Sequence, residues 1–318
     1  MADNDLTLSL IGQDNGAGLS DALFMKVFTG EILAAFDETN VMKALHRERT
    51  ISHGKSASFA VMWKANARYH TPGTPILGDN KILHSEKVIN IDDLLIADTA
   101  IYDLDEAKNH YDVRSEYSKQ LGAALAREYD KKTMQVSVLT ARASGNVTGS
   151  PGGSVLTNAN FATDGKVLAA GIFECAQIFD EKDIPSDGRI VLVSPAQYYL
   201  MAQETDLLNT LWHGSGVYAD GTILKVADIS IIKTNNLPKT NIAATITGEK
   251  NTYGGDFTNT VAVCFTREAL GTVKLRDLSV QKTGADFNVV YQSTLFVAKY
   301  AMGHGILRPE CSIELAKA

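Results

Sequence analysis

The chain has 318 residues, of which 45% are hydrophobic and 21% are charged, and these values are typical of a folded globular protein. Its formal net charge of −7 argues against a broad basic face that binds nucleic acid by neutralising phosphates. The start MADNDLTLSL lacks the basic and apolar regions of a secretion signal, and no apolar run approaches the roughly 18 residues that cross a bilayer. We therefore expect a protein that folds and stays in solution in a cytosol, without a membrane partner.

The first predicted elements are a polar arm and an amphipathic helix. Residues 1 to about 20 are polar and dotted with glycine, which predicts a mobile arm. In the following segment, SDALFMKVFTGEILAAF, apolar side chains recur at helical spacing and predict a stripe that must be buried against another element. The stripe consists of Phe24, Val27, Phe28, Ile32 and Phe36.

Between Arg49 and Ile91 the apolar period changes to two, which is typical of strands, and the turn-forming segment TPGTPILGDN lies in between. This pattern predicts a long hairpin arm. An isolated two-stranded ribbon is marginally stable because one face has nothing to bury against, so we expect the arm to lie on another surface, such as that of a second copy. The alternating apolar residues are Ala57, Phe59, Val61, Trp63, Ile89 and Ile91, and the arm carries the basic residues Lys55, Lys64, Arg68, Lys81 and Lys87.

A Gly-Lys-Ser tripeptide lies at the entrance to this arm, within TISHGKSASFAV, and matches the end of a phosphate-binding P-loop. The full motif requires another glycine five places before Gly54, because that glycine opens the turn that wraps the phosphates. Arg49 occupies the position. The sequence therefore favours a basic turn beside a strand over a nucleotide site.

A stretch of about forty residues, 103–143, contains no proline and a single glycine, and predicts a helical rod. At 1.5 Å per residue such a rod is roughly 60 Å long. Asp103 and Glu106 form a variant of the capping box at its start. Glu128 and Lys132 have the i,i+4 spacing of an ion pair near its other end.

The segment 144–163 contains no charged residue and is rich in glycine and serine, with one proline, so it predicts a linker. Beyond it, apolar positions from Leu168 to Phe179 mark a helix, RIVLV reads as a buried strand, and SPAQYYLMAQ predicts a helix with Ser194 as its N-cap. The strands DISIIKT and TVAVCFT complete a compact α/β unit.

The last part of the chain predicts further strands. TVKLRDLSV alternates with a slip at Arg276 and Asp277 that suggests a bulge, and STLFVAKYAM and CSIEL follow, parted by an expected turn at the GHG sequence of residues 303–305. We expect these strands to pair beside the rod rather than within the α/β unit.

No group of residues converges on a catalytic, cofactor or metal site. Asp112 and Glu116 are spaced to share a cation, yet a solvated helix face is the favoured reading, and the pair Asp92–Asp93 is better explained by capping. Ser194 follows a strand as a nucleophile elbow would, but VLVSPAQ lacks both glycines of that motif. The three cysteines are far apart and are expected to be buried and reduced.

Four segments of the sequence closely resemble the major capsid proteins of T7-like short-tailed phages. These are TISHGKSASFAV, HSEKVINIDDLLIADTAIYDLDEAKNHYDVRSEYSKQLG, GTVKLRDLSV and AKYAMGHGILRPE. The resemblance is strong over residues 20–130 and 265–310 and weaker over about 150–260.

The resemblance implies an α+β fold of the HK97 type. It has an N-terminal arm and helix at 1–46, an extended β-hairpin loop at 47–92, a peripheral domain with a long spine helix at 93–149 and 266–318, and an axial α/β domain at 150–265. It also implies a non-enzymatic major capsid protein without cofactors. Copies would assemble in the host cytoplasm as hexamers and pentamers of an icosahedral virion shell, around a scaffolding protein, with a portal protein at one vertex. The shell would then enclose double-stranded DNA without sequence-specific binding and expand.

Contacts between copies are expected where basic residues of the arm meet an acidic rod and where the C-terminal strands lie. Two alternatives remain open at this point: an encapsulin-type compartment of the same fold, and a nucleotide- or sugar-binding enzyme built on residues 150–265. The candidate contact residues are Lys55, Phe59, Lys64, Arg68, Asp105, Glu106, Asp112, Arg114, Glu116, Arg276, Asp277, His304 and Arg308.

Overall fold

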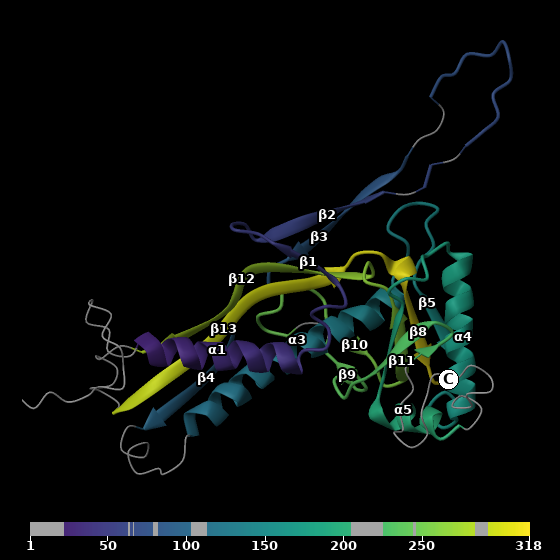
Figure 1. Ribbon diagram of the computed structural model, residues 1–318. Helices are drawn as coiled ribbons and strands as arrows, with labels where there is room; N and C mark the ends of the chain where they lie inside the picture. The colour runs from purple at the N-terminus through teal and green to yellow at the C-terminus, as the bar shows by residue number, and fades with distance from the viewer. Residues whose placement is uncertain are drawn as a thin grey trace, which may run out of the picture. The chain divides into compact units, whose positions relative to one another are not determined.

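The computed structural model describes residues 22–62, 64–65, 67–78, 82–102, 113–204, 225–243, 246–283 and 292–318 (Figure 1). Backbone contacts divide the chain into two units. The first unit comprises Met1–Asn40, Leu95–Arg127 and Asp277–Tyr300, and the second comprises Val41–Leu94, Glu128–Arg276 and Ala301–Ala318. The predicted arm at 1–20 and the predicted start of the rod at 103–112, with its capping box, lie outside the described residues.

The first unit combines two helices with one edge of a four-stranded sheet. It contains α1 (Ala22–Thr39), the first part of α3 (Val113–Arg142) and β4 (Leu95–Tyr102). The strands β12 (Leu270–Lys282) and β13 (Ser293–Ile306) each run through both units, and the sheet order is β1-β12-β13-β4. β13 pairs antiparallel with β4, from Ser293 opposite Tyr102 to Tyr300 opposite Leu95.

One face of α1 is buried, as its apolar spacing predicts. Phe28, Ile32 and Phe36 are at most 4% exposed, and the Phe28 ring centroid lies 4.6 Å from that of Phe296. A Cβ atom at Gly122 of α3 would stand 2.6 Å from the carbonyl oxygen of Ile32. Glycine at this position therefore allows the two helices to approach closely.

Val27 departs from the predicted stripe. It is 53% exposed, because it lies about 100° around the helix axis from Phe28, on which the packing is centred. The prediction is wrong at this position, and the Phe24 side chain lies outside the described residues.

The second unit is built on a six-stranded sheet in the order β5-β14-β11-β6-β8-β7. β11 pairs antiparallel with both β14 and β6, whereas the pairs β14–β5 and β6–β8 are parallel. A small second ribbon joins β9 (Asn241–Ile242) to β10 (Gly255–Asp256). The strands of the large sheet are β5 (Ser154–Thr157), β6 (Ile190–Val193), β7 (Lys225–Val226), β8 (Ile229–Lys233), β11 (Thr260–Phe265) and β14 (Ser312–Ala316).

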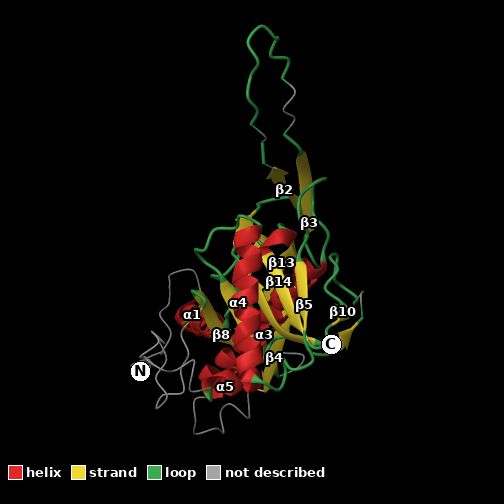
Figure 2. Ribbon diagram, turned by 90° about the vertical axis from the view of Figure 1, so that its right-hand side faces the viewer, coloured by secondary structure: helices red, strands yellow, loops and turns green. Residues whose placement is uncertain are grey.

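Helix α4 (Gly165–Glu181) covers one face of this sheet (Figure 2). The Asp164 carboxylate caps it by accepting the N–H groups of Lys166 and Val167. A Cβ atom at Gly171 would stand 3.2 Å from the Leu315 side chain of β14, so helix and sheet are in close contact. The predicted apolar stripe is confirmed, since Leu168, Ile172, Cys175 and Phe179 are all fully buried.

The short helix α5 (Pro195–Ala202) also lies where the sequence predicts it, with Ser194 at the N-cap position. The Ser194 side chain makes no capping hydrogen bond, however, and its buried hydroxyl has no hydrogen-bond partner among the described residues. Pro195 supplies the helical backbone angle and has no N–H to satisfy, which lowers the need for a capping side chain. The predicted N-cap position of Ser194 is therefore confirmed, whereas the capping hydrogen bond predicted from its side chain is wrong.

Two predictions about the strands that complete the sheet are wrong. The expected linker at 144–163 contains β5, and the C-terminal strand β14 lies between β5 and β11 rather than beside the rod. The physical reason is burial: every residue of β14 is buried, including Ile313 and Leu315 at 0% exposure. A strand whose side chains are buried on both faces requires a central position in a covered sheet.

The expected turn at GHG is also wrong, because β13 continues through residues 303–305. A Cβ atom at Gly303 would stand 1.8 Å from the carbonyl oxygen of Asn90, and one at Gly305 would stand 2.7 Å from the Ile89 side chain. Glycine within a strand often marks the close approach of another backbone, and that is its role here.

The alternation of β12 slips where the sequence predicts it. Arg276 and Asp277 are both exposed, and Leu278 is buried. The boundary between the two units falls between Arg276 and Asp277.

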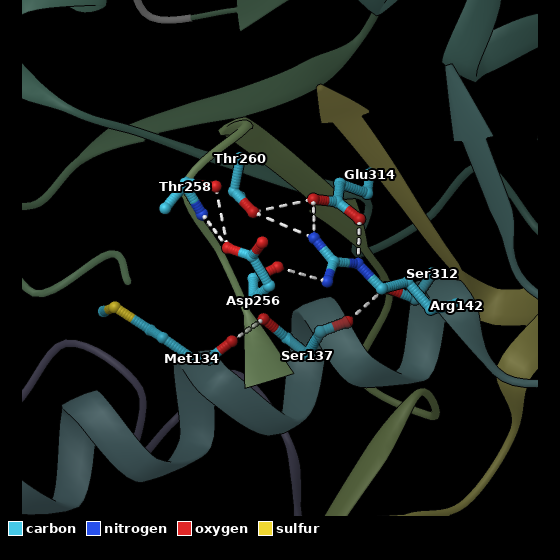
Figure 3. Close-up of polar contacts among 8 residues, drawn as sticks. All are labelled: Met134, Ser137, Arg142, Asp256, Thr258, Thr260, Ser312 and Glu314. Carbon is cyan, nitrogen blue, oxygen red and sulfur yellow. Dashed lines mark hydrogen bonds and ion pairs between the residues drawn. The ribbon is translucent and has the colours of Figure 1, made fainter. Parts of the chain in front are cut away.

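The C-terminal end of α3 is held to the six-stranded sheet by a polar clamp (Figure 3). Arg142 donates to both carboxylate oxygens of Glu314 at 2.6 Å and to the carbonyl oxygen of Asp256 at 2.6 Å. The hydroxyl of Thr260 donates to Glu314 at 2.7 Å, and that of Ser312 donates to the carbonyl oxygen of Ser137 at 2.9 Å. The bidentate geometry fixes α3 on β14.

The ion pair expected between Glu128 and Lys132 of α3 is wrong. Glu128 pairs instead with Lys131 at 2.8 Å, and Lys132 pairs with Glu249. Lys132 and Glu249 are largely buried, so this tertiary contact replaces the local one.

Candidate assembly surfaces

The arm is a two-stranded antiparallel ribbon formed by β2 (Ser56–Met62) and β3 (His84–Asn90), which continue into a long loop (Figure 1). The register runs from Ser56 opposite Asn90 to Met62 opposite His84. Along β2, exposed residues alternate with Ala57, Phe59 and Val61, which are buried or half-buried. The predicted period of two is confirmed up to Val61, and Trp63 lies outside the described residues.

The distal part of the arm presents apolar side chains to solvent. The described residues between 67 and 78 are all exposed, and Ile76 and Leu77 are 74% and 77% exposed. Tyr69 is fully exposed beside them in sequence. Grouped apolar side chains at such exposure are typical of a contact surface.

The root of the arm is buried in a small apolar cluster. Its members are Ala57, Ile89, Val273 and Leu307, with Ile51, Phe59 and Ile91 packed around them. Gly54, at the entrance, has a φ angle of +113°, which residues with a side chain rarely adopt. This backbone angle accounts for the glycine of the Gly-Lys-Ser tripeptide without a phosphate.

The returning strand is anchored by Asp92, immediately after β3. Its carboxylate accepts the backbone N–H of Lys250 at 2.7 Å, the Asn251 side-chain N–H at 3.1 Å and the Tyr253 hydroxyl. Burial raises the pKa of Asp92, and the same burial together with this carboxylate raises the pKa of Tyr253. The expected capping role of Asp92 is thus replaced by a longer-range one, which binds the loop at 248–253.

A network of two buried histidines lies in the second unit. His46 Nδ1 donates to the carbonyl oxygen of Met42 at 2.7 Å, so in the neutral ring Nε2 accepts, and it lies 2.6 Å from the Thr272 hydroxyl. That hydroxyl then accepts from His304 Nδ1 at 2.8 Å. The Tyr129 hydroxyl lies 3.1 Å from His46 Nε2 and donates to Glu48 at 2.9 Å. In this neutral arrangement, each of the four donors has an acceptor: His46 Nδ1, Thr272, His304 Nδ1 and Tyr129.

Burial lowers the pKa of both rings, to about 4 for His46 and about 3 for His304. His304 is 3% exposed, and its ring contacts Thr272, Tyr129 and Tyr253. A buried side chain is not available for contact with another copy, so the structure does not support His304 as a contact residue. The reason is that His304 belongs to the buried hydrogen-bond network.

A cleft of about 480 Å³ lies along β2. Its apolar lining includes Phe59, Val61 and Leu307. Arg47 of β1 (Arg47–Thr50) and Arg308 share the carboxylate of Glu268, at 2.6 Å and 2.5 Å. β1 pairs in parallel with β12, so these four residues of the predicted extended loop belong to a sheet edge.

The structure places the other predicted contact residues as follows. Lys55, Arg68, Arg276 and Asp277 are exposed, and Phe59 is half-buried. Lys64 pairs with Asp183 at 2.5 Å, Glu116 accepts from Gln120 at 3.1 Å, and Arg308 binds both Glu268 and Glu310. Asp105, Glu106, Asp112 and the side chain of Arg114 lie outside the described residues.

Asn251 and Tyr253 are functional candidates that sequence reasoning missed. They lie in a glycine-rich segment, and nothing in the local pattern links them to Asn90 and Asp92, about 160 positions away. The acidic pair directly after the predicted strand was the one available signal.

The described residues contain no group of three or more histidine, cysteine, aspartate or glutamate side chains that could hold a metal ion. The part of the chain with described structure also contains no helix that is long and apolar enough to span a membrane. The cysteines Cys175, Cys264 and Cys311 are buried and free, as predicted.

Comparison with protein families gives one match over most of the chain. Residues 58–316 match the family described as Gp10A-like, major capsid protein. The major capsid protein of Escherichia phage T7 is 34% identical over 326 residues, which cover 93% of this chain and 92% of that protein.

Solved structures give the same result. The capsid structure of the cyanophage P-SCSP1u has 42% sequence identity and a TM-score of 0.82, with 99% of each chain covered. The mature capsid of bacteriophage PhiM1 has 19% identity and a TM-score of 0.71 over 88% of this chain and 87% of that chain, which supports the fold alone.

Proposed function

This chain belongs to the Gp10A-like family of phage major capsid proteins, with the α+β fold of HK97-type capsids, and from this membership we propose that its copies close into a shell through their arms. Its role is structural and not enzymatic, as in its relatives, and those relatives are virion components. The encapsulin-type alternative is not favoured, because the relatives that cover most of the chain at 34% and 42% identity are phage capsid proteins.

The observation that supports the proposal best is the division of the arm into a buried root and an exposed distal part. The root gains stability from its own subunit through Ala57 and Ile89. The distal part exposes Tyr69, Ile76 and Leu77, which gain nothing until another surface covers them. Contact with a neighbouring copy supplies that surface, and self-association is the role that the relatives share.

The charges of the arm and the rod complement each other in this arrangement. Lys55 and Arg68 are exposed on the arm, and Glu116 is exposed on α3. One exposed pair is worth only about 0–1 kcal/mol. In a closed ring each copy repeats the same contact with the next, so small terms add around the ring. The other residues that stay predicted contacts between copies are Phe59 and Lys64 of the arm, Asp105, Glu106, Asp112 and Arg114 of the rod, and Arg276, Asp277 and Arg308 of the C-terminal part.

The proposed assembly is an icosahedral head of hexamers and pentamers, formed in the host cytoplasm around a scaffolding protein, with a portal protein at one vertex. It encloses double-stranded DNA and expands on maturation. A net charge of −7 suits an inner wall that must not adhere to packaged DNA. The peripheral bounds 93–149 and 266–318, the axial bounds 150–265 and the extended loop at 47–92 belong to this proposal, except that β14 (312–316) pairs within the six-stranded sheet and β1 (47–50) pairs with β12.

The test is expression of the chain with and without a candidate scaffolding protein, followed by negative-stain electron microscopy of the soluble fraction. Closed shells of uniform diameter are the expected result. A monodisperse small species under both conditions would contradict the proposal and would direct attention to a ligand of residues 150–265.

A further inference from the structure

At Asn90, the edge of β3 that does not pair with β2 is hydrogen-bonded by the Asn251 side chain and not by a third strand. The N–H of Ile91 donates to the carbonyl oxygen of Lys55 at 2.9 Å, so this pair is hydrogen-bonded across the ribbon. In an antiparallel ladder such pairs alternate, and the backbone groups of the adjacent residue, Asn90, point away from β2. Asn251 meets both: its Oδ1 accepts the Asn90 N–H at 3.1 Å, and its Nδ2 donates to the Asn90 carbonyl oxygen at 2.7 Å.

The loop that carries Asn251 is itself fixed to the chain just after β3. The N–H of Asp93 donates to the carbonyl oxygen of Gly248 at 2.9 Å, and the N–H of Lys250 donates to Asp92. Tyr253 is 1% exposed; its hydroxyl donates to Asp92 and accepts the N–H of His304 at 3.0 Å. The Asn251 amide is therefore held in place by contacts on both sides of it.

β13 also contacts the segment from Asn90 to Asp92. The N–H of Asp92 donates to the carbonyl oxygen of Met302 at 3.2 Å. Gly303 leaves room for the Asn90 carbonyl oxygen, and the Cβ position that glycine lacks also lies 3.1 Å from Asn251 Nδ2. At Asn90 the returning strand β3 therefore lies between the Asn251 amide and Gly303 of β13, which has no side chain. We call the rest of the second unit, without the arm, the body.

We infer that Asn251 is a positioning residue that sets the direction in which the arm leaves its subunit. This inference rests on the proposed role of the arm in assembly. Its physical basis is asymmetry: the outgoing strand at Gly54 has a flexible residue, whereas the returning strand at Asn90 has both free backbone groups bound by one rigid amide. Removing the Asn251 amide is expected to leave the rest of the second unit folded and to broaden the range of directions in which the arm projects from it.

The first test is hydrogen exchange of single backbone amides in the dispersed subunit. Asn251→Ala removes the acceptor of the Asn90 N–H, and the expected result is a loss of protection of about tenfold at Asn90. The Ile91 amide, whose acceptor is Lys55, is the internal reference and keeps its protection. Asn259→Ala, an exposed asparagine of the same unit, is the matched control and changes neither amide.

The second test measures the arm directly. Nitroxide labels at Ala60→Cys on β2 and Lys317→Cys on the body are both at exposed positions, and the three native cysteines are buried. The parent is expected to give one narrow distance distribution, and Asn251→Ala a broad one, with no change for Asn259→Ala. Asn251→Ser, whose hydroxyl is too short to meet both backbone groups, is a second variant with the same expected result.

An unchanged distance distribution in both Asn251 variants would overturn the inference, as would equal loss of protection at Asn90 and Ile91, which indicates general loosening. Shell formation is scored separately. If the parent itself forms no shells, the proposed function fails, and the distance measurement on dispersed subunits still decides the role of Asn251.

Discussion

The clamp at the end of α3 and the ribbon of the arm lie in the same unit and are stabilised in opposite ways. In the clamp, the Glu314 side chain is fully buried, and its carboxylate is bound by Arg142 of α3 and Thr260 of β11, as Figure 3 shows. In the arm, the described residues between 67 and 78 are all exposed, and only the root is buried in an apolar cluster. The clamp is stabilised within one chain, whereas the proposed role of the exposed part of the arm is contact with another copy.

The largest expected effect is in the clamp. Glu314→Ala leaves the Arg142 guanidinium without its buried partner, and breaking a buried pair in this way costs about 3–5 kcal/mol. The lower end is expected because the Arg142 side chain is 31% exposed. Urea unfolding of the dispersed subunit measures the loss. Glu128→Ala, which removes the exposed pair with Lys131, is the control, with an expected loss of about 0–0.5 kcal/mol. Equal losses of unfolding free energy in both variants would contradict the greater contribution of the buried clamp.

A pH titration of stability also tests the body. His46 and His304 have folded pKa values of about 4 and about 3, below the ordinary value near 6.5. The unfolded chain therefore binds more protons below pH 6.5, and the free energy of unfolding falls as the pH is lowered, by roughly 2 kcal/mol per histidine at pH 5. Burial raises the pKa of Asp92 and of Asp130, an α3 carboxylate that accepts the N–H groups of Val41 and Met42, and these two shifts change stability with the opposite sign.

Urea midpoints at pH 7.5, 6 and 5 check this expectation. The exposed His53→Asn variant should follow the parent at every pH. Stability that is constant from pH 7.5 to 5 would show that the buried rings are not neutral in the folded state.

A smaller effect is expected at the entrance to the arm. Gly54→Val forces a φ angle of +113° on a branched residue and should cost about 1–3 kcal/mol. No steric clash adds to this, because the nearest atom to a Cβ there is 3.7 Å away. Ser56→Ala should change stability by less than about 0.5 kcal/mol. Shell yield and urea unfolding are measured together, and similar shell yields for both variants would leave the glycine without an assembly role.

The smallest effect on stability is expected on the arm surface. Lys55→Glu and Arg68→Glu should each change the free energy of unfolding by no more than about 0.5 kcal/mol, because both side chains are exposed. Shell yield should nevertheless fall several-fold. Lys317→Glu, at an exposed position on the body, is the control with the same charge change. Normal shell yield in both arm variants would count against electrostatic contact between arm and rod.

Much of the fold could be predicted from local patterns. The stripe from Leu168 to Phe179, the buried strand Ile190–Val193 and the alternation of β2 each follow from periodicity within one element. The glycines of GHG predict a turn, because glycine is frequent in turns. Its glycines are required instead by Asn90 and Ile89, which lie more than 200 positions away. Contacts at such separation leave no trace in a local pattern.

The candidate surfaces were predicted less completely for the same reason. The exposed basic residues Lys55 and Arg68 could be found because charge and hairpin are both local features. His304 was misassigned because its partners, Thr272, His46 and Tyr129, come from three distant segments. Asn251 was missed because a single amide that binds backbone has no sequence signature.

The place of β14 in the large sheet has a consequence for synthesis on the ribosome. β5, β6, β8 and β11 are all translated before Ser312–Ala316, and among the described residues β5 pairs with that segment alone. The nascent chain therefore carries an incomplete sheet, with an open edge on β11, until residues 312–316 leave the exit tunnel. A chain that stops before Ser312 therefore lacks the strand that joins β5 to the rest of the six-stranded sheet.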